Sequence, residues 1–408
     1  MKLTHRLFLV SVILIFVQLN ASAKSDRKKR NTESAVVKMT DSTKANVKDS
    51  TKKETKAPYK TIKEITEKCK KKNGLFPIYQ DSTSGKTYIE INEDKIGKEF
   101  IYFAYVLDGY LSTGYARGGY KDNSVFKIEK YFDRIDFILQ NTSYYFDENN
   151  ALSKAKNANI NQPVFLSEKI AGATGKTYLI EADNLFLGES ITQIKPSKMP
   201  GEKADAFSLG TLNSKKSKYL AIKNFPSNTD VAVEYVFDNP APSNYGTDEV
   251  TDARFVSVKM QHSFIEIPQN NYKPRADDPR VGYFMDKVDD QTSTKAAPWK
   301  DVIHRWNLEK KHPDEKISEP VKPIVWWIEN TTPKEFRPIM KNAVLAWNEA
   351  FEQAGFKNAV ECYEQPDDAT WEADDIRYNV LRWTSSPRPP FGGYGPSFVN
   401  PRTGEIIG

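Results

Sequence analysis

The chain has 408 residues, a formal net charge of +5 at pH 7 and 39% hydrophobic residues, so it is long enough for several domains and apolar enough to bury cores. Between residues 24 and 58, eleven Lys or Arg stand against five Asp or Glu, and Lys2 and Arg6 add two more positive charges, which leaves −3 for the residues after Pro58. The part that can fold is therefore not basic, and this excludes a nucleic-acid groove as its main function.

The first 23 residues have the pattern of a signal peptide. Lys2 and Arg6 precede an apolar run over residues 7–19, and Ala21-Ser22-Ala23 offers a small-residue cleavage site. The run is too short to span a bilayer comfortably, which makes an uncleaved anchor the weaker alternative. We expect export to the periplasm, the cell envelope or the medium, without a transmembrane anchor. Residues 24–58 are polar and Lys-rich, which predicts a disordered basic linker that acts as a tether.

Folded sequence begins near Tyr59. Ile62, Ile65 and Cys69 mark one face of a short helix that ends at Asn73-Gly74. LFPIY and TYIEIN then flank turn residues 81–85, so residues 59–94 are expected to form a helix and a β-hairpin.

Residues 95–288 are expected to form a β-rich domain. Runs of Val, Ile, Phe and Tyr alternate with polar turns, and Val256, Val258 and Met260 alternate with polar neighbours at period two. A mostly antiparallel sheet follows from these segments: IGKEFIYFAYVLD, VFKIEKYFDRIDFILQ, KTYLIEADNLFLG, DVAVEYVFD and ARFVSVKMQHSFIEI.

Residues 289–322 are expected to connect this domain to the next through a helix. Trp299, Ile303 and Trp306 recur at i, i+4 and i+7 within WKDVIHRWNLEKK, which favours a helix over residues 299–311.

Just before this connector, Asp278 and Arg280 could suggest a charged site. A turn with a local ion pair and an Asx cap needs the same residue types and is the favoured interpretation.

Residues 323–408 predict an α/β lobe. IVWWIEN, residues 324–330, is apolar enough for a strand buried on both faces. Thr332 and Glu335 match a capping box, whereas Pro338 requires either a kinked first turn or a helix that begins there. One apolar helical stripe then ends at Gly355, and it comprises Phe336, Met340, Ala343, Trp347, Ala350 and Ala354.

Two further strands are expected over residues 358–364 and 375–383, which gives the order strand, helix, strand, strand and a right-handed crossover. The segment 392–408 is rich in Gly and Pro and predicts an edge strand followed by a hairpin turn at residues 400–404. The fold class expected for the whole chain is α+β.

Several of these segments resemble the Bacteroidetes-type secreted zinc-dependent metalloproteases, which are metzincin-like. The resemblance rests on PIVWWIENTTPKEFRPIMKNAVLAWNEAFEQAGFKNAV, DIRYNVLRW and GPSFVNPRTGEI, and on YKPRADDPRVGYF in the uncharacterised β-rich region that precedes the family's protease domain. It implies that residues 323–408 form the first half of a metzincin-like catalytic lobe. It also implies that the complete protein is a zinc-dependent endopeptidase acting on proteins or peptides.

The family's HExxHxxGxxH motif is not among these 408 residues, so we assign no catalytic residue and no metal ligand, and we expect no zinc on this chain. His262, His304 and His312 lack zinc-helix spacing and are interpreted as ordinary surface or half-buried histidines. Cys69 and Cys362 leave two options open, a disulfide or two free thiols. A non-enzymatic exported binding protein that uses its β-rich domain is the alternative function.

The resemblance also implies where substrate binds. In the family, an edge strand takes up an extended peptide as an additional antiparallel strand. The matching residues here are Gly395, Ser397, Phe398 and Val399, whose main chain would supply the hydrogen bonds. We further expect Trp326, Trp327 and Val380 to remain partly exposed. The sequence leaves the oligomeric state open.

Overall fold

The structure is a computed structural model that describes residues 59–197, 200–201, 203, 206–384, 392–395 and 397–408. The predicted signal peptide and basic linker lie outside the described residues, as does Pro396. Among the helices within the described ranges, none combines the length and the apolar character that crossing a membrane requires.

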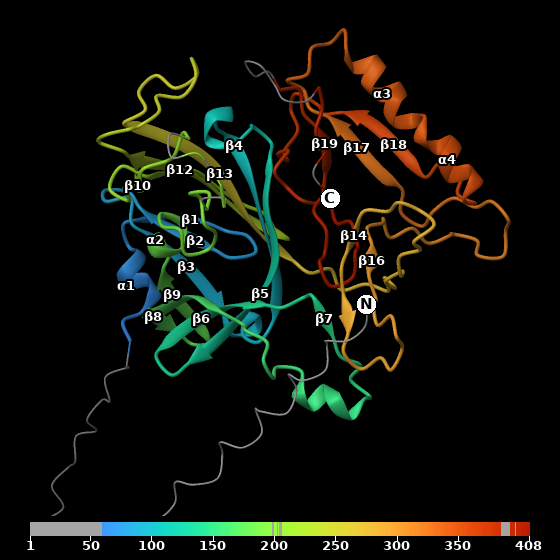
Figure 1. Ribbon diagram of the computed structural model, residues 1–408, viewed down its shortest axis with the longest axis horizontal. Coiled ribbons are helices and arrows are strands. Elements are labelled where there is room, and N and C mark those ends of the chain that lie inside the picture. The colour runs from blue at the N-terminus through green and yellow to red at the C-terminus, as the bar shows by residue number, and fades with distance from the viewer. Residues whose placement is uncertain (1–58, 198–199, 202, 204–205, 385–391, 396) are drawn as a thin grey trace, which may run out of the picture. The chain divides into compact units, whose positions relative to one another are not determined.

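Most of the structure is antiparallel β, which confirms the expected α+β class with a β-rich domain. A large curled sheet of twelve strands follows the order β1-β2-β3-β9-β8-β6-β5-β4-β13-β12-β10, and β11 also pairs with β12 (Figure 1). Its strands are β1 Cys69–Lys72, β2 Ile78–Asp81, β3 Thr87–Asn92, β4 Glu99–Asp108, β5 Tyr120–Tyr131, β6 Arg134–Gln140, β8 Val164–Thr174, β9 Thr177–Glu181, β10 Thr211–Leu212, β11 Lys218–Asn224, β12 Asn228–Asp238 and β13 Phe255–Glu266.

The two faces of the long central strands differ. On β4, β12 and β13 one set of alternate side chains points into the main core, as Tyr102, Val231 and Phe264 do. The other set, which includes Ile101 and Phe103, forms a second cluster with residues near the carboxyl end. The predicted period-two alternation of Val256, Val258 and Met260 is confirmed, since all three are buried on one face of β13.

The helix predicted near the start of the folded region is shorter than expected. α1 covers Ile62–Thr66, and its capping box joins Thr61 and Glu64. Cys69 lies in β1 instead, opposite Asp81 of β2. A five-residue helix has little stability of its own, so strand pairing at the sheet edge determines the conformation of the following residues. The predicted hairpin is confirmed as β2 and β3.

Two long strands lack a clear sequence signal. β8 contains Gly172 and several polar residues, and β11 contains Lys218 and Lys223, so neither shows a strong apolar alternation. Both are held by their neighbours, β8 between β6 and β9 and β11 against β12. Residues 171–174 belong to β8, and Gly175, with φ 59°, forms the turn to β9 together with Lys176.

The helix predicted over residues 299–311 is wrong. Val302–Ile303 forms β16, which pairs with β14, Met285–Asp286. The Ile303 N–H donates to the Arg275 carbonyl at 3.0 Å and the His304 N–H to the Phe284 carbonyl at 2.8 Å. These contacts with residues some twenty or thirty positions earlier outweigh the helical spacing of Trp299, Ile303 and Trp306, because helix propensity is a weak local preference. A second small pair joins β7 Tyr144–Tyr145 and β15 Asp289–Asp290 in parallel.

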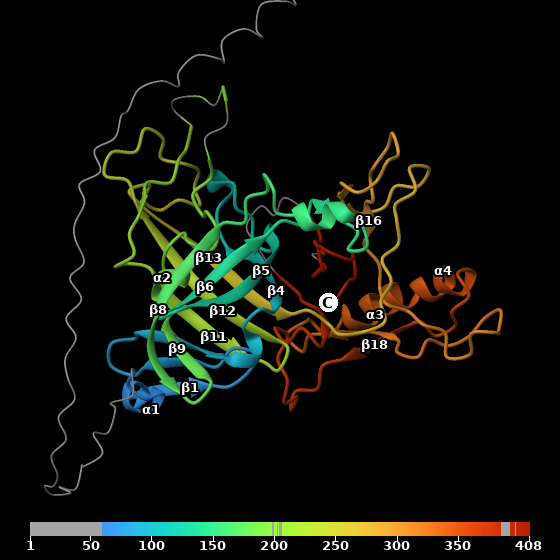
Figure 2. The ribbon, with the colours of Figure 1, turned by 90° about the horizontal axis from the view of Figure 1, so that it is seen from below.

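The lobe after Pro323 has the predicted order of strand, helix, strand and strand. Its parallel sheet has the order β18-β17-β19, with β17 Ile324–Ile328, β18 Val360–Glu364 and β19 Asn379–Leu381. Helices α3 Arg337–Leu345 and α4 Trp347–Gln353 run beside β18 (Figures 1 and 2). Gly355 ends the helical region with φ 92°.

The beginning of the helix differs from the predicted capping box. Pro338 stands in the first turn of α3, so the main helix begins there, as one of the two alternatives held. Thr332 is buried and lies outside the helix. The Arg337 guanidinium donates to the carbonyls of Thr332, at 2.9 Å, and Asn330, at 2.7 Å, and so holds the preceding residues in a turn.

The predicted apolar stripe does not form the buried face of the helices. Trp347 is 64% exposed, whereas Val344 and Phe351 pack against the lobe core. Asn348 explains why this face of the helices, and not the predicted stripe, is turned toward the sheet. Its amide donates to the Val360 carbonyl and accepts from the Val360 N–H, both at 2.9 Å. The two bonds fix the helix on the sheet. Trp326, Trp327 and Val380 are half-buried, in agreement with the expectation of partial exposure.

Candidate functional site

The predicted substrate residues lie in and beside a hairpin at the carboxyl end. Gly395 and Ser397 are exposed, Phe398 is half-buried and Val399 is buried. The Phe398 N–H donates to the Gly408 carbonyl at 2.8 Å, and the Ile407 N–H donates to the Phe398 carbonyl at 2.7 Å. The hairpin is therefore present as predicted, but one edge of its first strand is already paired within it.

The hairpin docks on the β-rich domain. The Phe398 ring lies 4.3 Å from the Phe103 ring of β4, and Asn123 of β5 donates from Nδ2 to the Val399 carbonyl at 3.1 Å. Arg402 forms a bidentate ion pair with Glu99, at 2.6 and 2.7 Å. Phe398 and Val399 therefore hold the two parts of the molecule together. A substrate-binding role for the four predicted residues stays a prediction.

The hairpin turn is also fixed by an internal hydrogen bond and by its close contact with Ile303. The Gly404 N–H donates to the Asn400 carbonyl at 2.9 Å, as the turn predicted over residues 400–404 requires. Gly404 has φ 74°, and a Cβ at this position would come within 2.2 Å of the Ile303 carbonyl oxygen. Only glycine fits this place.

A polar cluster extends the interface between lobe and domain. Lys223 of β11 bonds Asp374 and Glu372 of the lobe, both at 2.6 Å. Asn228 of β12 donates from Nδ2 to the Asp374 carbonyl at 2.9 Å and accepts from the Ile376 N–H at 3.2 Å. These contacts place a buried acidic residue of β12, Asp230, at the interface.

Sequence reasoning missed this polar cluster. Asp230 opens the run DVAVEYVFD and shares a strand face with Ala232 and Glu234, so its alternation predicts a solvent-facing position. In the structure Asp230 is 3% exposed. The signal that could have found it is a polar residue, Ser263, at the paired position of β13, but strand register cannot be read from one sequence.

His262 is fully buried, so its interpretation as a surface or half-buried residue is wrong. Tyr102 lies with its hydroxyl 2.8 Å from Nδ1, and Tyr235 with its hydroxyl 2.7 Å from Nε2. Because Tyr235 donates its own proton to the Phe186 carbonyl at 2.6 Å, its oxygen accepts from Nε2–H, and Nδ1 of the neutral ring accepts from the Tyr102 hydroxyl. Burial lowers the His262 pKa to about 3. This is a satisfied core histidine.

The other candidate ligands are scattered. His304 lies 3.2 Å from Asp286 through Nε2, and His312 is exposed. Within the described ranges, no group of three or more His, Cys, Asp or Glu side chains is placed to hold a metal ion. Cys69 and Cys362 are free thiols, which resolves the alternative left open by the sequence. Burial raises the pKa of both thiols, so neither is an activated nucleophile.

An open cleft of about 500 Å³ lies beside β18 in the lobe. Its lining includes Lys341, Asn348, Glu361 and Cys362. Asn348 is engaged by the main chain of Val360, and the Cys362 thiol is buried with a raised pKa. These groups do not form a nucleophile, base and oxyanion arrangement.

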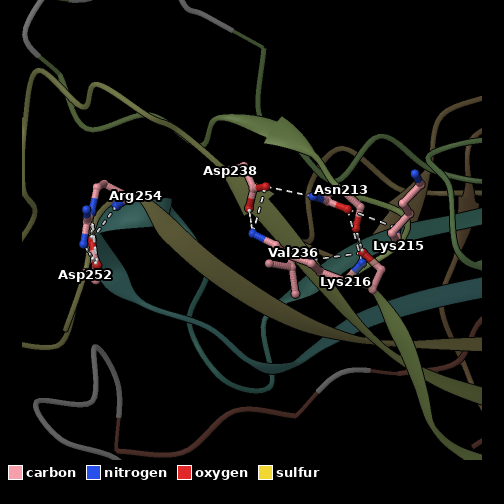
Figure 3. Close-up of polar contacts among 8 residues, drawn as sticks. Asn213, Lys215, Lys216, Val236, Asp238, Asp252 and Arg254 are labelled. Carbon is pink, nitrogen blue, oxygen red and sulfur yellow. Dashed lines mark hydrogen bonds and ion pairs between the residues drawn. The ribbon is translucent and has the colours of Figure 1, made fainter.

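Asp278 and Arg280 form a local turn, as predicted. The Arg280 N–H donates to Asp278 Oδ1 at 3.1 Å, and the guanidinium donates to Oδ2 at 2.6 Å. Figure 3 shows the same arrangement at Asp252 and Arg254, where the carboxylate accepts from the guanidinium at 2.7 Å. This Asp-x-Arg pattern is a structural unit of the chain and marks no site.

Residues 118–311 match the family model of a domain of unknown function, DUF5117. The match extends from near the start of β5 to beyond β16, so it includes Asp230, Asn228 and the other β12 and β13 residues that face the lobe. No curated protein matches the chain, and no solved structure matches it.

Proposed function

We propose that this chain is the amino-terminal part of an exported zinc-dependent endopeptidase that acts on proteins or peptides. The observation that carries the proposal is the lobe formed by β17, α3, α4, β18 and β19. Its parallel strands and crossover helices fall on the residues whose sequence resembles the start of a metzincin-like catalytic domain. The match of residues 118–311 to a domain of unknown function supports the same arrangement, since the resemblance implies an uncharacterised β-rich region ahead of the protease domain.

The described residues do not fit a zinc ion. His304 has one carboxylate nearby, and His262 has both ring nitrogens engaged by tyrosines. A catalytic zinc site needs three protein ligands around one open position. We therefore derive no catalytic step from these residues, and the zinc ligands and general base of the proposed enzyme are assigned to residues beyond Gly408.

The role proposed for the described residues is to support the catalytic lobe. The hairpin with Phe398 and Val399 fixes the lobe to β4 and β5, while Gly395 and Ser397 stay exposed beside it. An extended peptide would find main-chain groups at these two exposed residues. Because the contact uses backbone groups, it would select peptides by conformation more than by sequence.

Metal analysis and peptide hydrolysis test the proposal on two proteins. One is the 408-residue chain, and the other is the product of the same reading frame extended beyond Gly408. We expect no tightly held zinc and no hydrolysis for the first protein, and one zinc per chain with hydrolysis of an unfolded protein such as casein for the second. An extended product that holds no zinc, or a 408-residue chain that holds one after dialysis, would contradict the proposal.

A further inference from the structure

The carboxyl group of Asp230 lies between the β-rich domain and the lobe. Asp230 stands on β12, opposite Lys223 of β11 and opposite Ser263 of β13. Asp230 is 3% exposed, and its Oδ1 atom has no hydrogen-bond partner among the described residues. A buried carboxylate with an unpaired oxygen is costly, whereas a protonated carboxyl buries no charge.

The cation best placed to neutralise Asp230 is engaged elsewhere. Lys223 faces Asp230 across the strand pair, but its ammonium group bonds Asp374 and Glu372 of the lobe, both at 2.6 Å. With the lobe docked, the Lys223 ammonium therefore pairs with carboxylates of the lobe and leaves Asp230 without a cation partner.

The groups around Asp230 come from every element packed against it. β4 contributes Tyr105, whose pKa is raised by burial, and β13 contributes the neutral Gln261 and Ser263. The lobe contributes Asp374 and Arg382, and Arg382 is shared between Asp374 and Glu329, at 3.3 Å from each. Both cations of this cluster are thus committed to other carboxylates.

Burial, with a smaller contribution from the negative charge of Asp374, raises the Asp230 pKa to about 7. Ser263, Asn228 and Gln261 oppose the shift by hydrogen bonding but do not cancel it. The carboxyl therefore exchanges its proton near neutral pH while it is buried.

We propose that Asp230 is a proton-dependent contact that couples docking of the lobe to pH. With its proton, Asp230 adds no charge to the interface. When Asp230 loses its proton to solvent, its carboxylate stands beside that of Asp374, and no unpaired cation is available to neutralise it. The two negative charges then repel, and the lobe is held less tightly. This inference does not depend on the proposed peptidase activity.

The sign of the pH dependence of docking follows from the direction in which the Asp230 pKa is shifted. The pKa of Asp230 in the docked state is above its ordinary value of about 4, so the docked state binds the proton more tightly. The resulting stabilisation is complete below about pH 4 and is lost as pH rises through about 7. Between pH 5 and pH 8 the docking equilibrium should weaken roughly 10- to 100-fold.

The chain carries a built-in reporter for this test. All seven tryptophans lie at or after residue 299, so tryptophan fluorescence follows the carboxy-terminal part alone. Urea titrations of the full chain at pH 5 and pH 8 would measure its unfolding. We expect the wild-type equilibrium to shift by the stated factor, and Asp230→Asn to lose most of this dependence because its amide does not titrate.

Asp252→Asn is the matched control. Asp252, like Asp230, precedes β13 in the sequence, but its side chain is solvated. Its bond to Arg254 lowers its pKa to about 2 (Figure 3). It is charged at both pH values, so the variant should keep the wild-type dependence.

Two results would overturn the proposal: a lobe that is more stable at pH 8 than at pH 5, or an Asp230→Asn variant that keeps the full wild-type dependence. If circular dichroism shows that Asp230→Asn does not fold, Asp230→Thr takes its place, since threonine suits a strand and does not titrate. The same two outcomes then apply to it.

Discussion

The two faces of the β12 and β13 pair bury polar groups in opposite ways. On the inner face His262, opposite Val231, has both ring nitrogens bonded to tyrosine hydroxyls. On the outer face, at the neighbouring pair of the same ladder, Asp230 opposite Ser263 keeps an unpaired oxygen. A satisfied group makes the inner face a permanent core, whereas an unsatisfied acid makes the outer face an interface that responds to protons.

The largest difference between the faces should appear on truncating an inner aromatic side chain. Phe264 is buried and packs against Phe76 and Phe126, with ring centroids 6.0 and 5.0 Å away. Phe264→Ala should lower the free energy of unfolding by about 3–5 kcal/mol, because it leaves a cavity. Far-UV circular dichroism during urea unfolding would measure this. Phe255→Ala, on the same strand but 52% exposed, is the control and should cost less than about 1 kcal/mol.

Acid should affect the two faces in opposite directions. The pKa of buried His262 is lowered to about 3, so unfolding takes up a proton below the ordinary value of about 6.5. The β-rich domain therefore keeps its full stability above about pH 6.5 and loses it as pH falls toward 3.

Each pH unit in this range should cost about 1.4 kcal/mol from His262 alone. Circular dichroism of the strands would follow this loss, while tryptophan fluorescence follows the carboxy-terminal part from residue 299 onward at the same pH values. If the stability measured by circular dichroism and that measured by fluorescence change with pH in the same direction, the predicted contrast between the two faces is wrong.

The smallest expected effect concerns the ion pair at the rim of the interface. Arg402 and Glu99 are both partly exposed, at 36% and 29%, so solvent screens their attraction. Arg402→Ala should destabilise the lobe by less than about 1 kcal/mol. Asn123→Ala removes a partly buried hydrogen bond to the Val399 carbonyl and should cost about 1 kcal/mol. Tryptophan fluorescence in urea would rank the two, and a larger loss for Arg402→Ala would reverse their predicted order.

Local pattern predicted much of the fold. The alternation around Val258 identified the inner face of β13, and Pro338 indicated where the lobe helix begins. Contacts between distant residues account for the failures. Val302 joins a strand because it pairs with residues 276 and 286, and Asn348 orients its helix by binding Val360. Neither contact has a local signal, because both depend on register and tertiary packing.

The candidate site was less predictable than the fold. The hairpin turn before Gly404 has turn residues that can be recognised in the sequence, and the structure confirms the turn. Its docking partner Phe103 lies nearly three hundred residues earlier, and no periodicity connects the two. Burial of Asp230 likewise depends on a lobe that begins about ninety residues later, so its strand position alone indicated solvent.

The link between Glu99 and Arg402 spans 303 residues of sequence. A ribosome releases the chain from its amino end, so strand β4 emerges long before the hairpin that covers its outer face. Once β13 has also emerged, Ile101, Phe103 and Ile265 present an apolar strip that the hairpin has yet to cover. The time spent translating the last third of the gene therefore sets how long this strip is open to aggregation, and a chaperone that binds extended apolar surface would act during that interval.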